Sequence, residues 1–271
     1  MPFATPALYD LATTPAIDLL DVRIHTLGVA ELVSGIRHTI QTNQKRLISY
    51  ANVHAINMAH EDTRFMHFLN READIVFCDG FGVKWGATLL GLKLPHRFTP
   101  PDWIPQLCEL CVRNNFSMYF IGSRAGVTQK AADLLIARTA AAFPDLPRLR
   151  IVGTANGYFD KTSGHPENEA VIADINAAKP DILMVGFGMP MQEYWLADNW
   201  PKFNIHIALT GGAIFDYISG EMQRPPKWMT DNGLEWLGRL IAEPRRMWKR
   251  YLIGNPQFLS RIIGRRLRLS I

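Results

Sequence analysis

Seven residues, 186–192, have the types and spacing to hold a phosphate. They read Gly-Phe-Gly-Met-Pro-Met-Gln, after an apolar strand and before a helix. Gly186 and Gly188 let the backbone turn tightly with its N–H groups close to an anion, and Pro190 suits a first helical turn. The helix N-terminus adds the positive end of its dipole. The pattern alone is common in α/β proteins, where a strand–turn–helix connection without a ligand explains it equally well.

The same segment argues against a nicotinamide cofactor. A dinucleotide-binding fold has Gly-x-Gly-x-x-Gly and an acidic residue near the end of the next strand. Here Met191 stands at the third glycine position, and the next predicted strand ends in Thr210-Gly211-Gly212. We therefore expect no cofactor.

Asp79 has the setting of a general base. It follows a buried strand, so its carboxylate should lie at the rim of a cleft, where partly apolar surroundings raise the pKa. Local sequence alone favours the simpler alternative, an Asp-Gly turn.

No metal site is expected. The eight histidines show no ligand spacing supported by a third group, and the chain has no Asp-x-Asp pair. Cys108 and Cys111 lie one helical turn apart, which more often means two semi-buried thiols than a metal site. Three cysteines cannot all pair with each other, and a reducing compartment fits best.

Alternating strands and helices must position these residues. Strands are predicted over residues 22–27, 46–51, 75–78, 117–121, 150–152, 181–187 and 205–209. Helices are predicted over residues 29–42, 54–69, 102–114, 126–142, 167–178 and 192–199. This alternation predicts a Rossmann-like, mostly parallel sheet with helices on both faces. Ligands then bind beyond the carboxyl ends of the strands.

The pattern changes near Gly220. The chain has 271 residues, 48% of them hydrophobic, enough for one sizeable core. We expect an α/β domain over residues 1–220 and a basic, Trp-rich helical appendage over 221–271. From Arg224 onward there are eleven Lys or Arg and three acids, whereas the rest of the chain is net negative. Such a tail needs an anionic partner, which is a membrane surface, a nucleic acid or a phosphorylated ligand.

Six ordered blocks of the chain resemble the bacterial WecG/TagA/CpsF glycosyltransferases, which move a sugar from a UDP-sugar to a polyprenyl-diphosphate-linked sugar during surface polysaccharide synthesis. The blocks are residues 73–83, Arg97 with Asp102, Gly153 with 157–159, 186–193, 224–227, and 233–246 with 249–251. The resemblance covers residues 22–259. It implies an inverting mechanism without a metal.

The resemblance also implies roles for single residues. Asp79 matches the proposed base, and Tyr158 matches the tyrosine expected to stack on uracil. Three basic positions match Arg239, Arg246 and Arg250, with Lys249 an equally good candidate for the third; they would stabilise the departing diphosphate, with help from the Gln192 amide. Further contacts to substrate are expected from Asn52, Arg97, Asp216 and the two turn glycines Gly186 and Gly188. For each tail arginine, a plain exposed basic helix face is an equal alternative.

Two positions depart from the family's pattern. Tyr50 stands where many relatives have a small hydroxyl residue, a difference that leaves the identity of the donor sugar open. The run Phe98-Thr-Pro-Pro101 replaces a more usual glycine-containing stretch, which concerns the acceptor.

The sequence therefore predicts a glycosyltransferase for a hexose or N-acetylhexosamine. N-acetylmannosamine is the first expectation and UDP-glucose the alternative donor. Undecaprenyl diphosphate would carry the acceptor sugar. We expect a cytoplasmic enzyme, peripheral on the inner face of the bacterial membrane through its tail, without nucleic acid, and with self-association open. A basic nucleic-acid-binding protein is the competing class, and an oxidoreductase is a weaker third.

Overall fold

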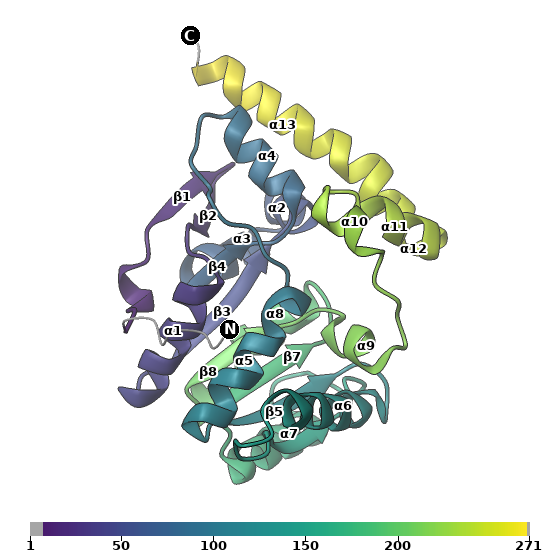
Figure 1. Ribbon diagram of the computed structural model, residues 1–271. Coiled ribbons are helices and arrows are strands. Elements are labelled where there is room, and N and C mark those ends of the chain that lie inside the picture. Colours follow the sequence, from purple (N-terminus) through teal and green to yellow (C-terminus); the bar gives the residue numbers. More distant parts are fainter. Residues whose placement is uncertain (1–7, 270–271) are drawn as a thin grey trace.

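An eight-stranded sheet forms the centre of the protein in a computed structural model that describes residues 8–269 (Figure 1). The strand order is β1-β2-β4-β3-β8-β7-β5-β6, with β1 antiparallel to β2 and every other pair parallel. The strands are β1 Ala16–Leu19, β2 Val22–His25, β3 Arg46–Ala51, β4 Ile75–Cys78, β5 Ser117–Gly122, β6 Arg150–Ala155, β7 Ile182–Gly186 and β8 Ile207–Thr210.

Helices cover both faces of this sheet, which confirms the predicted fold class. One buried cluster joins the sheet to α1, α5, α6 and α9, and the other joins it to α2, α3, α4, α7 and α8. These helices are α1 Val29–Gln41, α2 Val53–Glu61, α3 Thr63–His67, α4 Phe81–Leu89, α5 Pro100–Asn114, α6 Val127–Ala142, α7 Pro166–Ala178, α8 Met191–Asn199 and α9 Ile214–Ser219. Short 3-10 or π segments lie at η1 Leu11–Thr13, η2 Phe68–Glu72 and η3 Trp200–Lys202.

The structure corrects the predicted elements at four places. The single helix predicted over residues 54–69 is divided, because Asp62 is extended and its carboxylate accepts from the backbone N–H groups of Arg64 and Phe65, starting α3. Strand β1 was not predicted; it is short and pairs only with β2. Helices α4 and α9 were also missed, because both follow glycine-containing turns directly after a strand.

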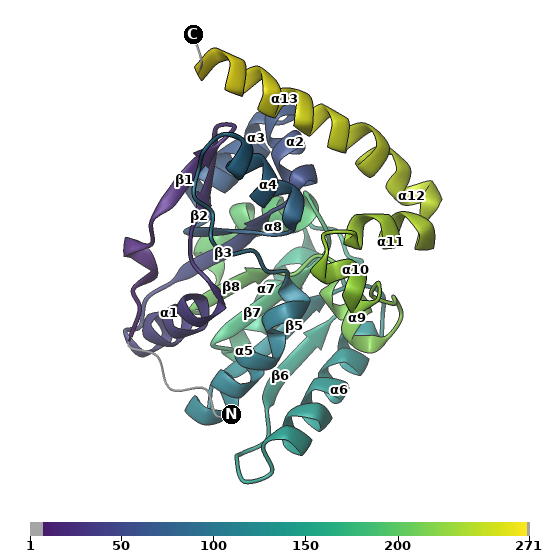
Figure 2. The same ribbon diagram turned by 45° about the horizontal axis from the view of Figure 1, so that its top comes forward.

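The chain continues beyond α9 as a run of helices that packs back onto the α/β part. They are α10 Lys227–Asp231, α11 Glu235–Ala242, α12 Pro244–Trp248, the π segment η4 Lys249–Ile253 and α13 Gly254–Leu269. Figures 1 and 2 show α13 lying across α2 and α4. Phe258 and Ile262 of α13 are buried in the second core cluster. A side chain at Gly86 of α4 would collide with the Phe258 ring, so the two helices approach closely.

Polar contacts fix the same helix. The Asn57 amide donates to the Gly254 carbonyl at 2.7 Å, and Arg265 pairs with Asp21 at 2.6 Å. Gly220 ends α9 in a left-handed conformation, at the point where the sequence pattern changes. A domain boundary there stays a prediction. Within residues 8–269, no helix combines the length and apolarity needed to cross a bilayer.

Candidate functional site

A cavity of about 1330 Å³ lies at the carboxyl ends of the parallel strands. Loops after β3, β4, β5, β6, β7 and β8 form its floor, and α11, α12 and η4 form its roof. Eleven of the thirteen residues predicted from sequence line it: Tyr50, Asn52, Asp79, Tyr158, Gly186, Gly188, Asp216, Arg239, Arg246, Lys249 and Arg250. The sheet and the C-terminal helices therefore build one site together.

A second cavity, of about 400 Å³, opens beside the first. It is lined mainly by apolar side chains of α4 and α13, among them Phe81, Trp85, Leu89, Phe258 and Ile262. Both cavities share seven residues: Asn52, His54, Asp79, Thr99, Glu235, Arg239 and Arg250. A polar and an apolar compartment thus meet at two carboxylates, Asp79 and Glu235, and two arginines.

Asp79 has the electrostatics of a base. Its pKa is raised from 3.8 to about 6, chiefly by burial and to a smaller extent by the nearby charge of Glu235. The hydrogen bond from Asn52 and the charges of Arg250 and Arg239 lower the pKa and limit the rise. The Asp79 carboxylate is therefore mostly ionised at neutral pH, yet it is more basic than an exposed aspartate.

The two shared arginines bring positive charge to this junction. Arg239 lies over the Tyr217 ring, with its guanidinium carbon 5.9 Å from the ring centre. Arg250 Nε is buried, and no group in the described part of the chain hydrogen-bonds it. A buried, unsatisfied donor on a cation is costly unless an anion binds there.

Arg246 and Lys249 lie further toward solvent. Arg246 is exposed and pairs with Glu243 at 3.0 Å, and the Lys249 ammonium is 5.6 Å from the centre of the Trp248 ring. Both line the large cavity but not the apolar one. Their charges reach the polar compartment from its rim.

Tyr158 lies at the opposite end of the large cavity and is 76% exposed. Its loop is held by Lys161, whose ammonium donates to the Gly157 carbonyl and lies between the rings of Phe159 and Phe187, 4.3 and 4.5 Å from their centres. The loop therefore presents an open aromatic face on a fixed backbone. Sequence reasoning did not identify Lys161.

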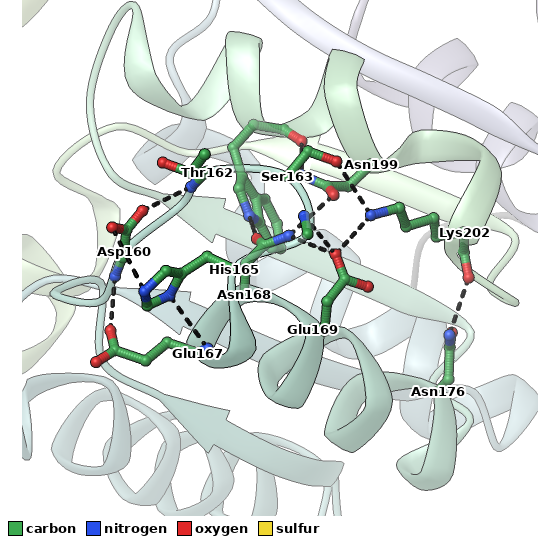
Figure 3. A network of polar contacts seen from close by, with 12 residues as sticks. Asp160, Thr162, Ser163, His165, Glu167, Asn168, Glu169, Asn176, Asn199 and Lys202 are labelled. Carbon is green, nitrogen blue, oxygen red and sulfur yellow. Dashed lines mark hydrogen bonds and ion pairs between the residues drawn. The ribbon is translucent and has the colours of Figure 1, made fainter.

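A polar network fixes the same loop from behind (Figure 3). Asp160 accepts from the Thr162 backbone and receives a second contact from His165, while its own N–H donates to Glu167. Lys202 bonds Ser163 and pairs with Glu169 at 2.6 Å. These contacts tie residues 160–165 to α7 and η3.

Asp216 receives a hydrogen bond from the Ser123 hydroxyl at 2.7 Å. Both line the large cavity, Asp216 from the first turn of α9 and Ser123 directly after β5. Asp216 is not an N-cap, the commoner use of such a residue. Ser123 was missed because the notable residue at that strand end is Gly122.

Gln192 and Arg97 are the two predicted residues that do not line the large cavity. Gln192 is fully buried, and its amide oxygen accepts from Gly188 N at 3.3 Å and Gly212 N at 3.0 Å. Its amide, and the N–H of Gly188, are thus already engaged within the protein.

Arg97 lines the apolar cavity. Its guanidinium donates to Asp102 at 3.5 Å and to the Thr230 carbonyl at 3.2 Å, and lies 4.2 Å from the centre of the Phe81 ring. It joins the loop before α5 to the C-terminal helices.

Three further residues escaped sequence reasoning: Glu235, His54 and Glu193. Glu235 lies within block 233–246, so the resemblance held a signal for it. His54 is neutral at pH 7, because burial and the nearby Arg250 charge lower its pKa to about 4. Among residues 8–269, no three His, Cys, Asp or Glu side chains come together in a group that could hold a metal ion.

The fold and this cavity define an α/β enzyme whose site lies at the carboxyl ends of parallel strands beneath basic helices. The chain belongs to the glycosyl transferase WecG/TagA/CpsF family, whose sequence model matches residues 17–271. It is therefore a glycosyltransferase, and the nucleic-acid-binding and oxidoreductase alternatives give way to this assignment.

Relatives from three species carry the same name. An N-acetylglucosaminyldiphosphoundecaprenol N-acetyl-beta-D-mannosaminyltransferase of Bacillus spizizenii is 28% identical over 240 residues, covering 86% of each chain. The Bacillus subtilis protein of that name is 26% identical over 80% of this chain and 78% of its own. The Staphylococcus aureus protein is 24% identical over 93% of both chains.

Proposed function

We propose that this protein is an inverting, metal-independent glycosyltransferase that moves N-acetylmannosamine from a UDP-sugar to an undecaprenyl-diphosphate-linked sugar in surface or exopolysaccharide synthesis. The observation that carries the proposal is the position of Asp79, at the junction of a polar and an apolar cavity and beside Arg239 and Arg250. The relatives' names support the sugar and the lipid-linked acceptor.

The donor would occupy the large cavity. Tyr158 offers a face for uracil stacking, and Asp216 with Ser123 offers hydrogen bonds to the base or ribose. The diphosphate would then lie toward Arg239, Arg246, Lys249 and Arg250, which line the roof. Cationic side chains without a metal can stabilise a departing diphosphate if they are already in place when its charge develops.

The acceptor would approach through the apolar cavity. Its walls suit the first isoprene units of a polyprenyl chain, and its inner end reaches Asp79. Asp79 would remove the proton from the acceptor hydroxyl as the oxygen forms its bond to the anomeric carbon. The bond from that carbon to the diphosphate breaks on the opposite face, and its electron pair leaves with UDP. Attack from the opposite face inverts the anomeric configuration.

A membrane would supply this lipid-linked acceptor to the C-terminal helices. Leu259, Ile263 and Leu267 of α13 lie at four-residue spacing and are 47%, 50% and 61% exposed. Exposed Trp85 and Leu89 of α4 lie at the mouth of the apolar cavity. An apolar helix face carrying arginines fits the interface of an anionic bilayer. The enzyme would then act as a peripheral protein on the cytoplasmic face.

Two measurements test this function. UDP should raise the melting temperature in the presence of EDTA, and magnesium should add nothing further. Product formation should then be followed with UDP-N-acetylmannosamine and, as the competing donor, UDP-glucose, using a short-chain lipid-linked N-acetylglucosamine acceptor. An inverting enzyme gives the anomer opposite to that of the donor, which NMR of the product reports. Absence of UDP stabilisation without metal would contradict the proposal.

A further inference from the structure

A buried carboxyl group lies directly behind the donor cavity. Glu193 of α8 is fully buried, and its Oε1 accepts from Gln192 Nε2 at 2.8 Å. No group in the part of the chain that the structure describes hydrogen-bonds its Oε2. Burial raises the pKa of Glu193 to about 7, so much of it is a neutral acid at physiological pH. Burying a carboxyl group with one oxygen unpaired is energetically unfavourable, which indicates a functional role for Glu193.

Gln192 connects this acid to two turns of the cavity wall. Because Glu193 accepts from the amide nitrogen, the amide oxygen is turned the other way, toward Gly188 N and Gly212 N. Gly188 and Gly212 both have positive φ values, 82° and 59°, a backbone conformation that residues other than glycine rarely adopt. One amide thus fixes the turn after β7 relative to the turn after β8.

Tyr50 completes the chain of contacts. The Tyr50 hydroxyl packs against the Gly212 turn, which the Gln192 amide oxygen holds. A Cβ atom on Gly212 would lie 2.5 Å from that oxygen, so the Gly212 turn and the Tyr50 hydroxyl are in tight contact. Tyr50 lines the large cavity close to Asn52 and Asp79, where the donor's hexose must lie if Asp79 acts on the acceptor. The titratable groups that feel the Glu193 charge are Tyr50 of β3 and Tyr194 of α8, whose pKa values it raises.

We propose that Glu193 is a positioning residue for the donor's hexose, acting through Gln192 on the two glycine turns and, through the Gly212 turn, on the Tyr50 hydroxyl, which contacts the sugar. The inference rests on the proposed function, since it places a UDP-sugar in the large cavity. It assigns to Tyr50 and Glu193 the recognition of the sugar, separate from recognition of UDP at the other end of the cavity.

The test compares binding of UDP and of the UDP-sugar, by calorimetry in EDTA, among four proteins and the wild type. Glu193→Ala should weaken UDP-sugar binding by about tenfold, the effect of losing about one hydrogen bond, and UDP binding much less. Glu193→Gln should stay within about twofold of wild type, because a neutral amide oxygen can still accept from Gln192. Ser117→Ala is the matched control: Ser117 is also buried, and its hydroxyl donates to Asp181 at 2.9 Å at the amino ends of β5 and β7, away from the cavity. It should lower the melting temperature and leave both affinities unchanged.

Tyr50→Phe reports on the same contact without disturbing the buried acid. It should weaken the UDP-sugar severalfold and leave UDP unchanged, which keeps the test decisive if Glu193→Ala does not fold. Equal UDP-sugar affinity in Tyr50→Phe and wild type would overturn the inference. So would a Glu193→Ala protein that binds like Ser117→Ala, or a Glu193→Gln protein as impaired as Glu193→Ala. A wild-type protein that binds no UDP would instead overturn the proposed function itself.

Discussion

The Asn52 side chain joins the ends of two neighbouring strands: its Nδ2 donates to Asp79 Oδ2 at 3.0 Å, while its Oδ1 accepts from Ala55 N at 3.0 Å. The second bond caps α2 and fixes the amide, so its N–H is held toward the Asp79 carboxylate. An N–H donor stabilises the ionised carboxylate, whereas the facing charge of Glu235 opposes ionisation. Asn52 and Glu235 thus shift the pKa of Asp79 in opposite directions.

The pH profile should respond to these two neighbours in opposite directions. Asp79 must be ionised to accept a proton, so kcat/KM should rise with pH through about 6, the raised pKa of Asp79. Asn52→Ala removes a contact that lowers this pKa and should move the acid limb to higher pH. Glu235→Gln removes a charge that raises it and should move the limb to lower pH.

Glu243→Gln is the control for this pair. Glu243 also lines the large cavity, but it is not among the groups that shift the pKa of Asp79. Its variant should keep the acid limb in place. The same direction of shift in Asn52→Ala and Glu235→Gln would contradict this account of Asp79.

Asp79→Asn should abolish turnover and leave nucleotide binding intact. Loss of a general base costs about 10²- to 10⁴-fold in rate, so kcat should fall by at least the lower figure. At neutral pH, the stability of the Asp79→Asn protein should instead be higher than that of wild type. The folded protein has an Asp79 pKa near 6 against 3.8 for the free side chain, so wild type loses stability as pH rises between these values, and the Asn variant does not lose it.

Melting temperatures of the two proteins at pH 4 and pH 7 check the sign, since the advantage of Asp79→Asn should be larger at pH 7. UDP stabilisation measured in parallel shows whether the site is intact. A near-normal rate in this variant would remove Asp79 from the role of base.

Asp102 holds the C-terminal helices over the site. Its carboxylate accepts from Arg224 at 2.7 Å and from Arg97 at 3.5 Å, and Arg224 also bonds the Thr99 hydroxyl at 3.0 Å. Asp102→Asn should lower kcat/KM by about tenfold, because about 1–2 kcal/mol of charge-assisted bonding between the two parts is lost. Limited proteolysis should then cut between α9 and α11 more quickly.

Arg265→Gln is the matched control for Asp102→Asn. The Arg265–Asp21 pair also ties the C-terminal helices to the α/β part, but its side chains are 35% and 57% exposed and it lies away from the cavity. Exposed pairs contribute little, so kcat/KM should be nearly unchanged. Equal loss in both variants would show that Asp102 acts only on general stability. Deleting residues 224–271 would be a poorer test than either substitution, since it removes Phe258 and Ile262 from the core.

The strands and the floor of the site could be predicted because both depend on local patterns. Buried, mostly apolar runs mark β3, β4 and β7, and in a parallel sheet the residues after them must meet at one edge. What sequence could not supply is the direction of side chains. Gln192 begins the predicted helix after the turn, but its side chain points inward and accepts from Gly188 and Gly212, because α8 begins immediately after the turn. The roof required knowing that α13 packs on α2 and α4, a contact across nearly 200 residues that no local pattern encodes.

The exposed face of α13 leads to a prediction about membranes. Ile263 and Leu267 lie on the same helix face and line neither cavity. Replacing both with Glu puts two negative charges where apolar side chains would enter the interface of an anionic bilayer, so co-sedimentation with vesicles containing phosphatidylglycerol should fall by roughly tenfold or more. Turnover of a lipid-embedded acceptor should fall with it, while turnover of a short, water-soluble acceptor should not. Val152→Glu, a substitution of a partly exposed apolar residue on the edge strand β6, should change neither measurement. Vesicle binding that survives the double substitution would show that another surface contacts the membrane.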